Sequence, residues 1–180
     1  MLKEQKETLI VCSVIGFAIL ISYVFVIQKH RNGSFDFWLG INEPTTRILY
    51  IFMLLAVIGF FMMVVDYCTK DTLPIDGLLS HKYAFVSLVG VALICALLWS
   101  IFVIQLSQAQ SSTMQKVWGG LTSTSLIGTA VASLLILAGQ FERSDGSVIA
   151  IVGALLFCIV TVLVDGIAWN SKLIYKLVHS

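Results

Sequence analysis

The sequence predicts an all-α integral membrane protein, a single domain over residues 1–180 built as a bundle of five transmembrane helices. Hydrophobic residues make up 58% of the chain and charged residues only 12%, whereas about a quarter of the residues in soluble domains are charged. The apolar residues lie in five uncharged runs, each close to the roughly 20 residues that a helix needs to cross a bilayer. The runs lack the apolar–polar alternation of a membrane β-barrel.

The uncharged runs set the approximate limits of the helices. Arg47 and Asp66, for example, bound the second run. Helices satisfy every backbone polar group within one segment, which lipid requires. The first run follows two lysines and has no small-residue cleavage site behind it, so we expect a retained signal anchor. The predicted spans are approximately residues 8–28, 47–66, 84–105, 117–139 and 147–168.

The connections between the runs differ in character. The first, residues 29–47, contains an aromatic cluster typical of an interfacial segment, and residues 42–45 (NEPT) have the pattern of a helix start. The third, residues 107–115, is rich in Ser and Gln, which predicts a flexible link. The fourth, residues 140–147, is so short that we expect helices four and five to form a tight antiparallel hairpin. A short interfacial turn of helix is expected from Lys172 onward.

Five spans place the two ends of the chain on opposite sides of the membrane. Five basic residues fall on the N-terminal side and six on the other side, so the positive-inside rule favours a cytoplasmic C-terminus by one residue. Asn32 begins a glycosylation sequon, which is usable only if the first loop is lumenal or extracellular. The sequence does not identify which membrane holds the protein.

Small residues recur every four positions in the fourth and fifth predicted helices. Such ladders let helix backbones approach closely and gain dispersion contacts that lipid does not supply. Packing between helices is therefore the favoured interpretation. The predicted helix-packing residues are Gly120, Thr124, Gly128, Ala132, Gly146, Ala150, Ala154 and Cys158.

A hydroxyl stripe of Ser125, Thr129 and Ser133 runs beside the first ladder. These side chains can bond preceding carbonyls of their own helix, which is a structural interpretation. Together with Asp165 they can instead line a polar pathway, because ionisable residues within a bilayer suggest function. Asp165 has a structural interpretation too, as an interfacial residue that marks the end of the fifth helix. If it is buried, we expect Lys172 or a hydroxyl of the fourth helix as its partner.

Motifs that would indicate chemistry are missing from the sequence. There is no His-Glu-x-x-His pair for a zinc protease and no Cys-x-x-Cys pair for a metal site. We therefore expect no enzymatic activity, no catalytic residues, no cofactor and no metal. Eleven basic residues against ten acidic ones create no basic field, so no nucleic-acid partner is expected.

The predicted topology resembles that of the tryptophan-rich sensory protein (translocator protein) family. The likeness rests on five helices, a long aromatic first loop, and Trp99-Ser100 followed by Phe102. It implies a five-helix bundle that binds porphyrins or sterols. The clustered Trp and Pro residues of that family are reduced here to Trp38 and Pro44, and the fifth helix lacks the proline-tyrosine start. No site residue is carried over from the family.

Three functional classes remain as hypotheses. The favoured one is a non-enzymatic helix-packing subunit or scaffold of a larger membrane complex, because small residues form ladders and no span carries a charge at its centre. Its partners would be the lipid bilayer and other membrane-protein chains or further copies of itself. The second is a small-solute channel or carrier lined by the hydroxyl stripe and Asp165. The third is a five-helix binder of a lipophilic ligand with an aromatic-capped pocket.

Overall fold

The computed structural model describes residues 2–31, 43–70, 77–81, 83–143 and 147–179. Every regular element in these ranges is a helix, which confirms the predicted all-α class for them. The elements in chain order are α1 (Lys3–Arg31), α2 (Glu43–Thr69), α3 (Ala84–Gln108), α4 (Ser112–Glu142), α5 (Val148–Ile159), the π-helical segment η1 (Val160–Trp169) and α6 (Asn170–His179).

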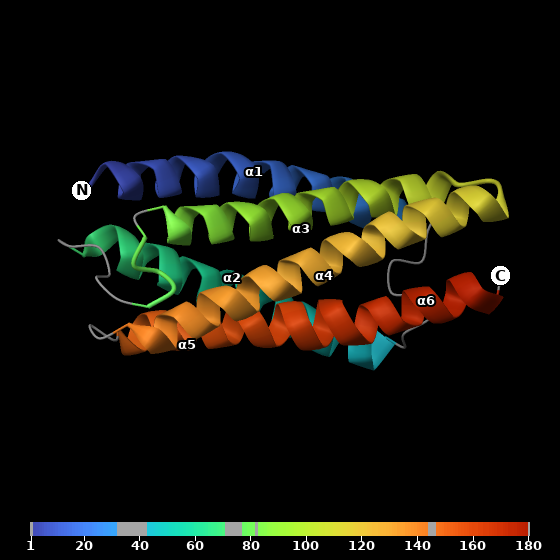
Figure 1. Ribbon diagram of the computed structural model, residues 1–180. Helices are drawn as coiled ribbons and strands as arrows, with labels where there is room; N and C mark the ends of the chain where they lie inside the picture. Colours follow the sequence, from blue (N-terminus) through green and yellow to red (C-terminus); the bar gives the residue numbers. More distant parts are fainter. Residues whose placement is uncertain (1, 32–42, 71–76, 82, 144–146, 180) are drawn as a thin grey trace.

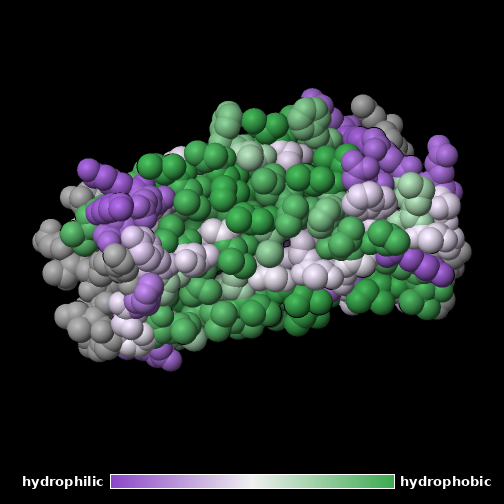
Figure 2. All heavy atoms as spheres, turned by 45° about the horizontal axis from the view of Figure 1, so that its top comes forward, coloured by the Kyte–Doolittle hydropathy of each residue, from purple (hydrophilic) through white to green (hydrophobic). Residues whose placement is uncertain are grey.

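Five helices of the described chain are long and apolar enough to cross a membrane. The last of them joins α5, η1 and α6 into one continuous rod over Val148–Val178. Figure 2 shows a broad hydrophobic surface between two hydrophilic ends. This distribution agrees with the predicted multi-pass integral membrane protein, since apolar side chains face the hydrocarbon and charged ones face water.

The long helices lie side by side along one axis (Figure 1). α1 packs beside α3, α2 packs against α5, and α4 crosses obliquely so that it contacts both α3 and the α5–η1–α6 rod. α1 begins at one end of the bundle and α6 finishes at the other. The first described helix thus begins and the last one finishes at opposite ends of the bundle, as an odd number of membrane passes predicts.

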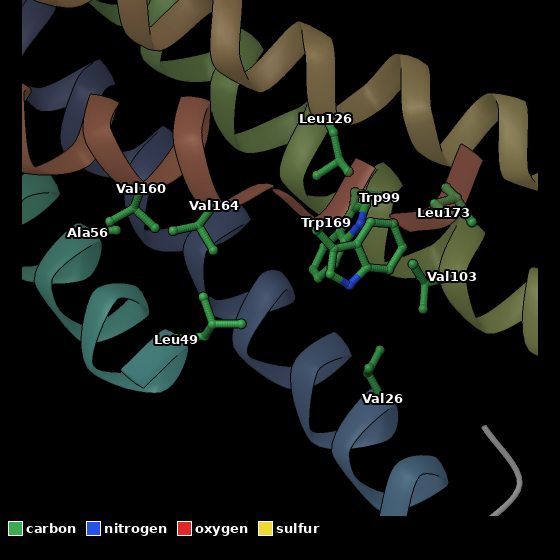
Figure 3. Close-up of a cluster of buried hydrophobic side chains, with 10 residues drawn as sticks. All are labelled: Val26, Leu49, Ala56, Trp99, Val103, Leu126, Val160, Val164, Trp169 and Leu173. Carbon is green, nitrogen blue, oxygen red and sulfur yellow. The ribbon is translucent and has the colours of Figure 1, made fainter. Parts of the chain in front are cut away.

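Two clusters of buried apolar side chains form the core. One lies among α2, α3, α4 and α5, where the Tyr67 and Phe85 rings stack with centroids 4.3 Å apart. The other surrounds two tryptophans, Trp99 of α3 and Trp169 of η1, which lie side by side in Figure 3. Burying aromatic side chains contributes much of the stability of a helix bundle.

A close approach of two helix backbones joins α2 to α5. A methyl group placed on Gly59 would lie 2.5 Å from the carbonyl oxygen of Gly153, and one on Gly153 would lie 2.6 Å from that of Gly59. No side chain fits at either position without moving a backbone. The two glycines thus let α2 and α5 pack at backbone contact.

A polar network closes the end of the bundle at which α4 finishes. The buried Arg143 guanidinium lies 3.8 Å from the Asp66 carboxylate of α2 and donates a 2.8 Å hydrogen bond to Gln140. From α1, the Gln5 amide donates to the carbonyls of Tyr67 and Lys70. These carbonyls lie at or just beyond the last turn of α2, where a helix leaves backbone acceptors without partners of its own.

The connections between the helices agree only in part with those predicted. α2 begins at Glu43 with proline in its first turn, which confirms the predicted helix start. The flexible third link is wrong, because α3 continues to Gln108 and α4 begins at Ser112. Ser111 is an N-cap whose hydroxyl accepts the Met114 N–H at 3.2 Å, and such a bond fixes a helix start. The tail from Lys172 is helical, as expected, and it belongs to α6, which continues from η1 without a break.

Three expectations fall on residues outside the described ranges. These are the interfacial aromatic cluster of the first loop, the Asn32 sequon, and the connection through residues 144–146. The tight hairpin of α4 and α5 therefore stays a prediction.

Candidate functional site

The small-residue ladder of α4 divides between the interior and the surface. A methyl group on Gly128 would lie 2.7 Å from the Cys95 sulfur of α3, and Ala132 is buried. Gly120 and Thr124, by contrast, are exposed, and a methyl group on Gly120 would meet nothing within 4 Å. Half of the ladder thus lies between helices of this chain, and the other half faces outward.

The ladder of the fifth helix is buried wherever it is described. Ala150, Ala154 and Cys158 are each at most 5% exposed, while Gly146 lies outside the described ranges. The contact of Gly59 with Gly153 is tighter, and the sequence analysis missed it. The available signal was one glycine near the middle of each of two apolar runs, with no small neighbours at four-residue spacing to suggest a pair.

The hydroxyl stripe is buried, and its hydroxyls bond within the fold. Thr129 donates to the carbonyl of Ser125, and Ser125 and Ser133 likewise bond carbonyls of the preceding turn. Ser133 also shares a 2.6 Å hydrogen bond with Thr161 of η1. Ser133 therefore joins α4 to the α5–η1–α6 rod, while the printed bonds of Ser125 and Thr129 stay within α4.

Asp165 lies one turn after Thr161, inside η1. The interpretation of Asp165 as a marker of the helix end is wrong, because the rod continues through α6 to His179. Asp165 lies near the middle of the rod Val148–Val178, where the apolar α5 gives way to α6 with its Asn170 and Lys172. The residue is partly buried. In the described part of the chain, its carboxylate forms no hydrogen bond and no ion pair.

An aromatic group of α1 lies within electrostatic range of Asp165. Tyr23 of α1 is near enough to Asp165 for an electrostatic interaction between the two side chains. The Tyr23 ring packs on Trp99 with centroids 5.6 Å apart, and Trp99 meets Trp169 edge-on at 5.7 Å. A 2.7 Å hydrogen bond from Ser100 to Ser22 holds α1 against α3 at the same level.

Asn170 adds a second polar group next to Asp165. Its backbone N–H bonds the carbonyl of Asp165, which places the two residues one π-turn apart. The Asn170 side chain is 6% exposed, and its Oδ1 atom has no hydrogen-bond partner among the described residues. A buried amide oxygen without a partner costs about 1–3 kcal/mol, so it calls for an explanation.

We call the group of Tyr23, Trp99, Asp165, Trp169 and Asn170 the Asp165 cluster. It offers one carboxylate, one free amide oxygen and one phenol oxygen. Such hard oxygen ligands suit a group 1 or group 2 cation, and a single carboxylate matches a single positive charge. In the described ranges no three His, Cys, Asp or Glu residues gather as a transition-metal site would require.

The sequence singled out Asp165 but not its neighbours. Tyr23 is one of several aromatic residues in the first span, and Asn170 lies beyond the predicted end of the fifth. The π-helical hydrogen bond from Asn170 to Asp165 could not be predicted, because the hydropathy pattern does not distinguish π-helix from α-helix. π-Helical turns are frequent at functional sites, so this segment supports interest in the cluster.

Comparison with known proteins gives no relative. No family model, no curated protein and no solved structure matches this chain.

Proposed function

We propose that this chain is a non-enzymatic multi-pass membrane protein that binds a monovalent cation at the Asp165 cluster and works as a small-solute carrier or channel. The observation that carries the proposal is a carboxylate without an ion-pair partner in the described chain, one π-turn before a residue whose buried amide oxygen has no hydrogen-bond donor among the described residues. Ionisable groups in spans are costly and mark ion or substrate paths. A bound cation would satisfy both groups at once.

Among the described residues, no basic side chain forms an ion pair with Asp165. Lys172 follows Asp165 on the same rod, yet its side chain is exposed and forms no ion pair with Asp165. The hydroxyl stripe supports a path, since Thr129 is buried and Ser133 lies at the contact of α4 with η1. Their hydroxyls already donate to carbonyls, which leaves oxygen lone pairs free to accept or to coordinate.

Tryptophan fluorescence tests cation binding directly. Trp99 and Trp169 belong to the cluster, and replacing Trp38 and Trp118 with Phe leaves these two as reporters. Purified protein would be titrated with NaCl or KCl against choline chloride at constant ionic strength. We expect a saturable change that Asp165→Asn removes and that Glu7→Gln, near the start of α1 where Glu7 pairs with Lys3, retains. A flat titration of the parent protein with both salts refutes the proposal.

Asn170→Leu separates a binding role from a structural one. It removes the unpaired oxygen, so we expect weaker cation binding together with equal or higher thermal stability. Loss of both binding and stability would instead give Asn170 a structural role. In liposomes, Thr129→Leu and Asp165→Asn should each abolish solute or cation flux. Unchanged flux removes these two residues from the path.

A second candidate is the helix-packing subunit of a larger membrane complex. Only 11% of the most apolar window of α1 is buried, against 39% for α3. On α1, a methyl group on Gly16 would meet nothing within 4 Å. A small residue on an outer face is typical of a surface on which another transmembrane helix packs.

The particle mass in a mild detergent tests this second candidate. A stoichiometric partner, or a homo-oligomer that Gly16→Leu disrupts, would support assembly through α1. A monomer that purifies alone under several mild detergents would count against it.

A further inference from the structure

A groove of about 420 Å³ opens between α4 and α6 at the end of the bundle where the chain finishes. Leu177 of α6 occupies the space beside Gly119 and forms the floor of the groove. Beside it Gly120 has no neighbour, so the groove stays open along α4. Ile174 and Val178 of α6 form an apolar wall. We call this the α4–α6 groove.

Polar groups lie on the α4 side of the groove. Lys116 stands one turn before Gly120, and Ser123 one turn after Gly119. The Lys116 side chain is exposed, so its ammonium can reach the headgroup region while its stem lies along the apolar surface. The groove therefore combines an apolar wall, a hydroxyl and one positive charge.

The charges of this end of the bundle favour an anionic occupant. The described charged side chains at the ends of α1, α2, α4 and α6 are all basic here, namely Lys29, Arg47, Lys116, Lys172 and Lys176. At the opposite end, Lys3 pairs with Glu7, and Arg143 pairs with Asp66. Basic pockets between transmembrane helices bind anionic headgroups on the cytoplasmic side.

We propose that the α4–α6 groove binds an anionic phospholipid, with its phosphate at Lys116 and the upper part of an acyl chain over Gly120. A free anion would use the lysine but leave the wall of Ile174 and Val178 exposed to water. A partner helix would have to bury the unpaired Lys116 ammonium, which is costly in an apolar contact. The lipid satisfies both parts of the groove, and its position agrees with a cytoplasmic C-terminus.

Native mass spectrometry of the full chain tests the proposal. The protein would be taken from bilayers of phosphatidylcholine and phosphatidylglycerol, and the retained lipids counted at increasing collision energy. We expect one phosphatidylglycerol to be held selectively. Lys116→Gln should weaken its retention about fivefold, the effect of one basic residue near an anionic surface. Gly120→Leu should remove it, because the new side chain fills the groove.

Ala138→Leu is the matched control for Gly120→Leu. It adds the same side chain at another exposed small residue of α4, 18 positions from Gly120 and outside the lining of the groove. It should leave phosphatidylglycerol retention unchanged. Equal retention by the parent and by both groove variants overturns the proposal.

Two other results also contradict the proposal. Displacement of the lipid by inorganic phosphate alone would show a simple anion site. A dimeric mass that Gly120→Leu abolishes would show that a second copy of the chain fills the groove.

Discussion

The contact of α2 with α5 gives the sharpest prediction, because two backbones meet there with no side chain between them. In Gly59→Ala, the new methyl group would lie 2.5 Å from the Gly153 oxygen, whereas ordinary contact begins near 3.4 Å. The helices must therefore separate by about 0.9 Å, and a gap of that size forfeits a quarter to a half of each dispersion contact it opens. Overpacking of this kind costs about 1–3 kcal/mol.

Alanine also favours helix over glycine by up to about 1 kcal/mol, which works against the loss. The net expectation is a destabilisation of up to about 2 kcal/mol in Gly59→Ala, which is about 1–3 kcal/mol relative to Gly16→Ala. Gly16→Ala carries the same helix preference without a clash and should be neutral or slightly stabilising. The free energy of unfolding would be measured by circular dichroism in mixed detergent micelles with increasing SDS. If Gly59→Ala proves as stable as Gly16→Ala, the backbone contact is not real.

Three other changes test the polar contacts between helices. Arg143→Ala should cost about 3–5 kcal/mol, since it leaves the buried Asp66 carboxylate without its cation. Adding Asp66→Asn should recover part of the lost stability. A thermal melt in which the double variant is no more stable than Arg143→Ala would argue against the ion pair of Arg143 with Asp66. Thr161→Val removes the bond to Ser133 and should cost about 0.6 kcal/mol, a typical value for interhelical bonds in membranes. Gln5→Ala should speed hydrogen exchange in the last turn of α2, with α4 unchanged as the internal reference.

The long helices were predictable because hydropathy alone distinguishes apolar runs. Their ends were not, since a helix continues wherever its backbone is capped or packed. The Ser/Gln-rich segment shows this: polarity suggested a link, but the Ser111 cap starts α4 almost as soon as α3 ends. Serine is a common N-cap residue, so Ser111 was a possible helix start. The polar residues around it favoured the interpretation as a link instead.

Single residues of the candidate site could be predicted from the sequence, but the contacts between them could not. Asp165 stood out as an acid next to an apolar run. Asp66 was interpreted as a boundary residue, although it pairs with Arg143, a residue far along the chain. Which helices pair, and which residue of one meets which of the other, depends on packing of the whole bundle. A single sequence has no period or motif that encodes such pairings.

The π-helical segment also determines which side of the last rod each end presents. Each i→i+5 turn holds more residues than an α-turn, so ten such residues change the angular phase of everything that follows. α5 directs Gly153 at α2, while α6 directs Leu177 at α4. An uninterrupted α-helix of the same length would carry Leu177 to a different azimuth. Deleting one residue from η1 would therefore act as a rotation of α6, and would move Leu177 away from Gly119 without altering any side chain of α4.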